Sequence, residues 1–296
     1  MLSPESRPPG LRVHAALTAV ALLFTSNYII AKLGMREFSP LSFAWLRVAA
    51  SAVILWFLAR HDPLPREDRG RVVFFAILAV VINQTMFLSG LAFTTVQVAA
   101  ILITSIPVFA LGLAIALGHE RASAMRIGGI ALAAAGALLV VGGEGFTGTA
   151  RSLLGAAMIL INCFGYALYL VVSKPHMARL SPRSVVSWMF AVGTLMMLPI
   201  CAVPLWRENW SAISSGAWLA LAAVVLGPTV AAYLLQAWAL RHADSSSVAA
   251  YVYVQPVLAT LLGAMIFGER VRPIVMVAAV MIFAGVWLAG RSTVTM

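Results

Sequence analysis

The sequence predicts an all-α integral membrane protein with ten transmembrane helices, arranged as two inverted five-helix repeats. Three observations lead to this class. Hydrophobic residues make up 62% of the 296 residues and charged residues only 10%, whereas soluble domains carry about 25% charged residues. Apolar runs long enough to cross a bilayer, about 20 residues each, recur ten times along the chain. The second half of the chain also repeats landmarks of the first half.

Short connections separate the ten apolar runs, and none of them is long enough to hold a soluble domain. The polar, proline-containing stretch 1–13 is expected to be a cytoplasmic tail. The first run has no small-residue cleavage site behind it, so we interpret it as a retained span and not as a signal peptide. The expected spans are 14–34, 41–59, 72–92, 97–118 and 124–143, followed by 153–173, 183–205, 216–240, 246–267 and 273–290.

The net charge of +10 is distributed unevenly across the two expected membrane faces. With ten spans, thirteen Lys and Arg residues fall on the side that holds both termini, six fall on the opposite side, and Arg47 lies within a span. Loops rich in Lys and Arg stay on the cytoplasmic side. Both termini are therefore predicted to be cytoplasmic, in a bacterial inner membrane. Since topology accounts for the basic excess, no nucleic-acid partner is expected.

Two five-span units, 14–143 and 153–290, share matched residues. A shift of 149 positions aligns the later part of each unit, and a shift of 142 aligns the earlier part, which requires one seven-residue insertion in a loop. Because five is an odd number, the second unit must cross the membrane in the opposite sense to the first. Inverted repeats of this kind are typical of transporters with a substrate site near the bilayer midplane. The matched pairs include Pro107 with Pro256, Glu120 with Glu269, and Lys32 with Lys174.

Pro107 and Pro256 interrupt two of the apolar spans. Proline lacks an amide hydrogen, so the carbonyl groups of Ile103 and Val252 lose their helical partners. In lipid, such a carbonyl is tolerated only where protein or water satisfies it. We interpret the two prolines as hinges. The alternative is that each proline is a kink that only improves packing.

Charged side chains are rare inside the expected spans. No carboxylate lies in the middle of a span, and proton-driven pumps usually keep one there as a relay. The sequence therefore favours a facilitator driven by the gradient of its substrate, with coupling through an interfacial carboxylate left open. Arg47 is expected either to attract a substrate carboxylate near the outer mouth, or to snorkel outward or bind Glu37 and helix-end carbonyls. Lys32, nearer a span end, is expected to snorkel.

Uncharged polar and aromatic residues recur at helical spacing in several spans. Asn162, Tyr166 and Tyr169, for example, share one helix face. Such stripes can be interhelical hydrogen bonds or interfacial aromatic belts, or they can line a shared cavity for a small amphipathic zwitterion, which we favour. Phosphate recognition would need several convergent cations. The candidate substrate-binding residues are Asn27, Tyr28, Trp45, Arg47, Asn83, Gln84, Asn162, Tyr166, Tyr169, Trp188, Tyr233, Gln236, Tyr251 and Gln255.

Enzyme motifs are missing from the sequence. His119-Glu120 is followed by Ser123 where a zinc-binding helix needs a second histidine, and neither GxSxG nor a Gly-rich phosphate loop occurs. Cys163 and Cys201 fall within expected spans, where thiols act as small apolar groups. We expect no enzymatic activity, cofactor, metal or disulfide. Small-residue faces on the fifth and tenth spans favour packing within a monomer, with a weak homodimer as the alternative.

The segments "SNYIIAKLGMREFSPLSFAWLRVAASAVIL", "VQVAAILITSIPVFALGLAIALGHE" and "SSSVAAYVYVQPVLATLLGAMIFGE" resemble the opening and closing parts of the EamA repeat of the drug/metabolite transporter superfamily. The resemblance covers nearly the whole chain. It implies ten helices in an inverted five-plus-five arrangement and export of metabolites or amino acids, with aromatic-amino-acid exporters as a candidate close match. The first copy departs from the pattern at 94–97, where the second copy has a serine-rich turn at 245–247.

These features predict a carrier that exports amino acids or similar small amphipathic metabolites by alternating access. Its expected partners are a small-molecule substrate and the lipid bilayer. Two alternatives remain open. One is efflux of lipophilic cations held against aromatic faces. The other is an intramembrane scaffold or receptor without flux.

Overall fold

A computed structural model describes residues 11–118 and 149–243 without interruption, together with 124–125, 127–129, 131–132, 135–136, 139, 248–249, 251–253, 255, 265–266, 268 and 273–291. Over these residues the chain is helical and contains no strand. Seven helical stretches are long and apolar enough to cross a membrane. They are Leu11–Gly34, Pro40–Ala59, Arg66–Phe93, Val98–Ala116, Ala150–Met177, Pro182–Arg207 and Ser215–His242.

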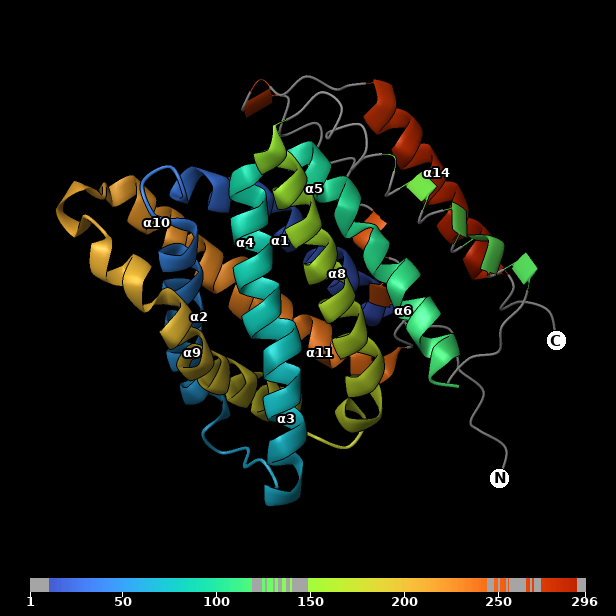
Figure 1. Ribbon diagram of the computed structural model, residues 1–296. Coiled ribbons are helices and arrows are strands. Elements are labelled where there is room, and N and C mark those ends of the chain that lie inside the picture. Colours follow the sequence, from blue (N-terminus) through green and yellow to red (C-terminus); the bar gives the residue numbers. More distant parts are fainter. Residues whose placement is uncertain are drawn as a thin grey trace.

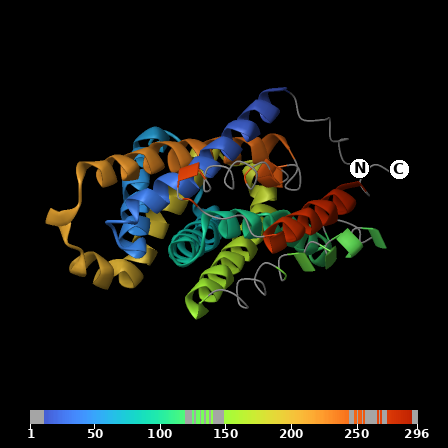
Figure 2. The ribbon, with the colours of Figure 1, turned by 90° about the horizontal axis from the view of Figure 1, so that it is seen from above.

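Each of these stretches coincides with one expected span, and most extend beyond it by several residues (Figure 1). The expected fifth and ninth spans are described only in fragments, so the described residues do not decide whether the spans number ten. The helices are α1 (Leu11–Gly34), α2 (Pro40–Ala59), α3 (Arg69–Ala76), α4 (Asn83–Phe93), α5 (Val96–Ile103), α6 (Ser105–Ala116), α8 (Ala150–Met177), α9 (Pro182–Arg207), α10 (Ser215–Val224), α11 (Ala232–His242) and α14 (Pro273–Arg291). Figure 2 shows α14 at one edge of the molecule and the turn between α9 and α10 at the opposite edge.

Hydroxyl side chains begin several of the helices. Ser39 accepts a hydrogen bond from the amide of Ser42 at 3.3 Å, and Pro40 occupies the first position of α2, where a missing N–H has no cost. Thr95, Thr149 and Ser214 start α5, α8 and α10 in the same way. After α6 the chain leaves the helix through Gly118, whose φ of 73° favours glycine.

Two of the spans contain a π-helical segment in the middle. η2 (Ile77–Ile82) separates α3 from α4, and η4 (Val225–Ala231) separates α10 from α11. Pro228 in η4 has no N–H for the carbonyl of Val224, four residues earlier. The hydroxyl of Thr229 donates to that carbonyl at 2.7 Å instead. Such segments are frequent at functional sites, and η2 shifted by 149 positions falls within η4.

At one end of the helices, polar contacts join the α1–α2 turn to the α9–α10 turn. The carboxylate of Glu37 accepts hydrogen bonds from the amide and the hydroxyl of Ser214 at 2.6 and 2.8 Å. The carboxylate of Glu208 accepts from the amide of Ser39 at 3.2 and 3.3 Å. These carboxylates therefore lie at the ends of spans.

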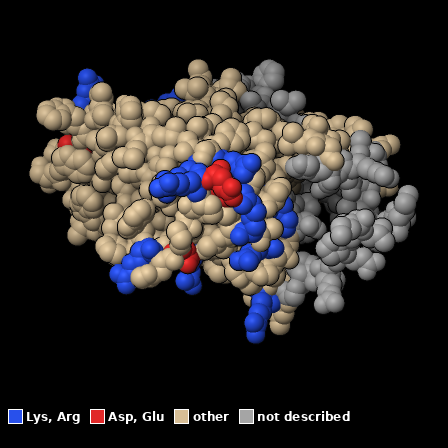
Figure 3. All heavy atoms as spheres, turned by 90° about the horizontal axis from the view of Figure 1, so that it is seen from below, with Lys and Arg blue, Asp and Glu red and all other residues tan. Residues whose placement is uncertain are grey.

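At the other end, the loop after α2 meets the turn between α8 and α9. Asp68 is fully buried, and its carboxylate pairs with Arg71 and Arg179. The hydroxyl of Ser181 donates to Asp62 at 2.9 Å. Figure 3 shows this end of the molecule, where Lys and Arg side chains gather around a few acidic ones.

Two lysines contact helix ends. Lys32 of α1 donates to the carbonyl of Thr94, which follows α4, at 3.3 Å. Lys174 of α8 donates to the carbonyls of Leu240, at 2.8 Å, and Ala243, at the end of α11. A cation is favourable at a helix C-terminus, where the last carbonyls have no helical partner. The sequence suggested that Lys32 would snorkel. In the structure its ammonium contacts the end of another helix.

Replacement of Glu37 by glutamine is expected to lower thermal stability at neutral pH. The N–H and hydroxyl of Ser214 hold the pKa of Glu37 below its ordinary value of 4.5. A carboxylate with a lowered folded pKa stabilises the fold above its unfolded pKa, and the contribution disappears as pH falls through the folded value. The difference in Tm between the wild type and Glu37→Gln should therefore shrink on acidification below pH about 4.5. A difference that does not change with pH would contradict this assignment.

Candidate functional site

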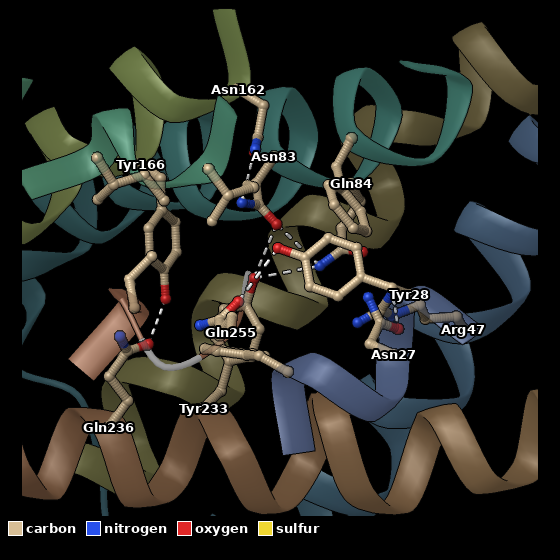
Figure 4. Close-up of a pocket in the computed structure, with 15 residues that line it drawn as sticks. Asn27, Tyr28, Arg47, Asn83, Gln84, Asn162, Tyr166, Tyr233, Gln236 and Gln255 are labelled. Carbon is tan, nitrogen blue, oxygen red and sulfur yellow. Dashed lines mark hydrogen bonds between the residues drawn. The ribbon is translucent and has the colours of Figure 1, made fainter. Parts of the chain in front are cut away.

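A buried pocket lies among helices from both halves of the chain (Figure 4). Its volume of about 60 Å³ is enough for a few water molecules. Ten of the fourteen candidate substrate-binding residues line it. The lining residues are Phe24, Asn27, Tyr28, Arg47, Asn83, Gln84, Phe87, Ile103, Ile106, Asn162, Tyr166, Tyr233, Gln236, Val252 and Gln255.

The two π-helical segments present polar residues to the pocket. Asn83 and Gln84 follow η2 directly, and Tyr233 stands two residues after the end of η4. The hydroxyl of Tyr233 lies 3.0 Å from the carbonyl of Ala79 and 3.0 Å from Asn83 Oδ1, and it accepts a hydrogen bond from Gln84 Nε2 at 3.1 Å. One phenol therefore connects the middle of one span with the middle of another.

Further amides and phenols complete the polar wall. Asn83 Nδ2 donates to Asn162 Oδ1 at 2.7 Å. Gln84 Oε1 and Asn162 Nδ2 are buried and have no partner among the residues that the structure describes. The hydroxyl of Tyr28 donates to Gln255 Oε1 at 3.1 Å. The pocket thus keeps one acceptor and one donor that no described residue uses.

Tyr166 and Gln236 close another part of the pocket by a hydrogen bond between the phenol and Oε1. The remaining lining groups are apolar. Phe87 packs edge-on against Tyr28, with ring centroids 5.6 Å apart. Amide and phenol groups alternating with apolar side chains suit a small molecule with both polar and apolar parts.

Arg47 provides the positive charge of the pocket. Its side chain is only 2% exposed. Nε donates to Thr229 Oγ1 at 2.9 Å, and Nη1 donates to Asn27 Oδ1 at 3.1 Å. Both acceptors are neutral, and within the described part of the chain no carboxylate pairs with this guanidinium. Arg47 therefore neither snorkels nor binds Glu37, and its side chain lines the pocket. That it attracts a substrate carboxylate near the outer mouth stays a prediction.

Four candidate residues lie outside the pocket lining. Trp45 lies two residues before Arg47 in α2, so its side chain points away from the helix face that carries Arg47. Its indole N–H donates to the carbonyl of Thr194 at 3.1 Å. Tyr169 is buried against Phe75.

Trp188 and Tyr251 are also placed elsewhere. Trp188 packs against Trp56, with ring centroids 6.2 Å apart, at a second cavity. Tyr251 belongs to a 3₁₀ turn, Tyr251–Tyr253, and its hydroxyl bonds to His14. An α-helical spacing of four positions would place Tyr251 beside Gln255, but Tyr251 does not lie in an α-helix.

Several residues at the pocket escaped the sequence-based list. Phe24 precedes Asn27 and Tyr28 by three and four positions, so helical spacing could have found it. Ile103 and Val252 also line the pocket. Each lies four positions before a proline, which has no N–H to donate to its carbonyl.

The predicted break near Pro107 is present in the structure. α5 ends at Ile103, the chain turns at Thr104, and α6 begins at Ser105. Pro107 itself is buried. Pro256 lies outside the described residues, and whether either proline acts as a hinge stays a prediction.

Cysteines and metal ligands contribute little to the site. Cys163 and Cys201 are free and buried, and the thiol of Cys163 contacts the carbonyl of Leu102 at 3.4 Å. Over the ranges that the structure describes, no three His, Cys, Asp or Glu side chains cluster as metal ligands would. That the protein needs no metal or cofactor stays a prediction.

Replacement of Tyr233 by phenylalanine is expected to destabilise the protein by about 2 kcal/mol, because buried polar partners lose their hydrogen bond. Thermal unfolding of the purified protein would measure the loss. Tyr251→Phe is the matched control, since its hydroxyl contacts an exposed histidine outside the pocket. An equal Tm for Tyr233→Phe and the wild type would show that the phenol does not hold the two spans together.

A multi-pass helical chain with a buried polar pocket between its two halves has the architecture of a membrane transporter. The chain belongs to the EamA-like transporter family, whose family model matches residues 12–142 and 153–291. It is thus a membrane transporter of this family, in the drug/metabolite transporter superfamily.

Relatives named as transporters agree with this assignment, and a solved structure shares the fold. An uncharacterized transporter of Archaeoglobus fulgidus is 24% identical, over 94% of this chain and 96% of its own length. The uncharacterized inner membrane transporter YedA of Escherichia coli K12 is 25% identical, over 93% and 89%. A probable terminal-alkyne amino-acid exporter of Streptantibioticus cattleyicolor is 24% identical, over 94% and 93%. A crystal structure with 16% identity has the same fold, with a TM-score of 0.68 over 96% of this chain and 99% of the other.

Proposed function

We propose that this transporter exports amino acids or closely similar amphipathic zwitterions by alternating access. The observation that carries the proposal is the environment of Arg47. A buried guanidinium with only two neutral partners among the described residues keeps N–H groups for an anionic ligand, and Arg binds carboxylates through paired hydrogen bonds. The name of the Streptantibioticus cattleyicolor relative, an amino-acid exporter, supports the same class.

The pocket offers complementary groups for the rest of an amino acid. The substrate carboxylate would bind at Arg47 and Asn27. The ammonium group would donate to the unused Gln84 Oε1, with the ring of Tyr28 nearby as a cation–π surface. The side chain of the substrate would face Phe87 and the other apolar lining residues.

We further propose ten spans in two inverted five-helix units, 14–143 and 153–290. Support comes from the family model, which matches two segments of the chain, and from the π-helical segments at corresponding positions. The loop contacts also fit, since the first turn of one unit meets the second turn of the other at each end. In this arrangement the pocket of about 60 Å³ would enlarge when the two units move apart on one side.

The transport is proposed to run without a proton relay. Among the described carboxylates, all lie at the ends of spans or in the loops between them. They are Glu37, Asp62, Glu67, Asp68 and Glu208. With no carboxylate at pocket depth in these ranges, the gradient of the substrate itself would drive export.

Counterflow in proteoliposomes tests the proposal. Vesicles loaded with an unlabelled neutral amino acid should accumulate the labelled one, and a proton ionophore should leave the accumulation unchanged. Abolition by the ionophore would show proton coupling. Absence of saturable counterflow for a panel of amino acids would contradict the assigned substrate class.

Competition by lipophilic cations separates the alternatives. The buried positive charge of Arg47 disfavours a permanent cation in the pocket, so a lipophilic dye should neither be transported nor compete. Dye efflux without amino-acid flux would instead assign multidrug efflux. Cysteines introduced at Tyr166 that react from one side only, with or without solutes, would favour a scaffold or receptor.

A further inference from the structure

A second cavity lies at the end of the molecule shown in Figure 3. It is enclosed by the end of α2, the loop that follows, the start of α3 and the first turns of α9. Its volume is about 150 Å³, which can hold a phosphate-sized group. It shares no residue with the substrate pocket. The lining residues are Trp56, Ala59, Arg60, Asp62, Pro63, Leu64, Arg69, Ser187 and Trp188.

Two arginines supply the positive charge of this cavity. Arg69 holds its guanidinium 5.1 Å from the centre of the Trp188 ring, which orients the group across the cavity wall. Arg60 donates through Nε to His61 at 3.0 Å, so its terminal N–H groups stay available. In the described ranges neither arginine forms an ion pair.

Two further polar groups decide what the cavity can bind. Ser187 is 1% exposed, and its hydroxyl has no hydrogen-bond partner in the described part of the protein. A buried polar group without a partner is uncommon in proteins, and a ligand in the cavity would supply the missing hydrogen bond. Asp62 also lines the cavity, and its carboxylate accepts from the hydroxyl of Ser181. Two cations against one carboxylate leave the cavity positive.

The outer face of α2 beside the cavity is apolar and exposed. Val53, Trp56 and Phe57 have exposed fractions of 58%, 51% and 64%. In a membrane protein such a face contacts acyl chains, and tryptophan prefers the level of the lipid headgroups. The cavity therefore has arginines at one side and a lipid-facing surface at the other.

We infer that this cavity binds the phosphate group of an anionic lipid. Arg60 and Arg69 donate to the phosphate oxygens, and Ser187 adds a neutral donor. The acyl chains lie along the exposed face of α2. Arginine is well matched to phosphate, and basic pockets between spans on the cytoplasmic side hold anionic headgroups. This inference does not depend on which substrate the central pocket carries.

The test compares two double variants of the full-length protein in detergent. In Arg60→Gln/Arg69→Gln the cavity loses both cations. In the control Arg12→Gln/Arg241→Gln, two exposed arginines outside the cavity are replaced. Native mass spectrometry measures the affinity for phosphatidylglycerol and phosphatidylcholine, and size-exclusion chromatography checks the fold. Each arginine near anionic lipid contributes about 1 kcal/mol, so the cavity variant should bind phosphatidylglycerol roughly thirtyfold more weakly.

The control variant should bind phosphatidylglycerol as the wild type does. Equal affinities of both double variants would overturn the inference, and so would equally tight binding of phosphatidylcholine by the wild type. Inorganic phosphate is the soluble competitor. Displacement of phosphatidylglycerol by inorganic phosphate at similar concentration would overturn the lipid assignment and give the cavity to a soluble phosphate compound.

Discussion

Replacement of Arg47 by glutamine is expected to lower the transport efficiency for amino acids by about 100-fold or more. The guanidinium is buried and has only Thr229 and Asn27 as partners among the described residues. A hydrogen bond to a charged group contributes about 1.5–3 kcal/mol, and a carboxylate bound by two such bonds loses both. The variant should remain folded, because it removes a buried charge and leaves neutral groups that can bond to glutamine.

Counterflow measured at several substrate concentrations tests this expectation. The control Arg241→Gln, at the exposed end of α11, should transport as the wild type does. A second substrate separates charge recognition from general damage. A decarboxylated amine analogue carries no carboxylate for Arg47 and is a cation, so Arg47→Gln should handle it at least as well as the wild type does. Full activity of Arg47→Gln toward the amino acid would remove the basis of the proposed substrate class.

Replacement of Gly90 by alanine is expected to destabilise the protein by about 3 kcal/mol, the upper range for overpacking. α4 and α8 cross where Gly90 meets Gly155. A Cβ atom on Gly90 would lie 2.8 Å from the carbonyl oxygen of Gly155 and 2.8 Å from Cγ1 of Ile159. The carbonyl is part of a helix backbone and cannot move aside as a flexible side chain would, so the helices must separate.

Thermal unfolding in detergent measures this effect, and Gly112→Ala is the matched control. A Cβ atom on Gly112 in α6 meets no atom within 4 Å. Since alanine is the better helix former, this variant should gain about 0.5–1 kcal/mol. A Tm of Gly90→Ala equal to that of the wild type would show that the α4–α8 crossing can widen without cost. Each variant adds a single methyl group, so the difference between their Tm values reports on the packing at the α4–α8 crossing.

The sequence alone determined the class of the protein and the positions of the seven spans that the structure describes. In lipid each backbone polar group must be satisfied within its own segment, so a span of about 20 apolar residues is visible without any tertiary information. The polar residues inside such spans are few, and most of them face protein. For this reason ten of the fourteen residues chosen from the sequence line the pocket.

Only the tertiary structure decided which of these residues meet. Trp45, Tyr169, Trp188 and Tyr251 fit the same pattern of polar and aromatic residues, yet they lie outside the pocket, because the rotation of each helix about its axis is set by its neighbours. The positions of the π-helical segments also depend on the packing of neighbouring helices. At η2 the side chain of Val80 occupies the space left by Gly193, where a Cβ atom would lie 2.5 Å from Cγ1 of Val80.

The partners of Arg47 show the same limit. Sequence established that a cation lay inside a span, and therefore that it needed a partner or water. Thr229 lies 182 positions away and reaches the guanidinium only because η4 and α2 pack together. Apolar length is a property of one segment and can be read from it, whereas the pairing of polar groups depends on how several segments pack.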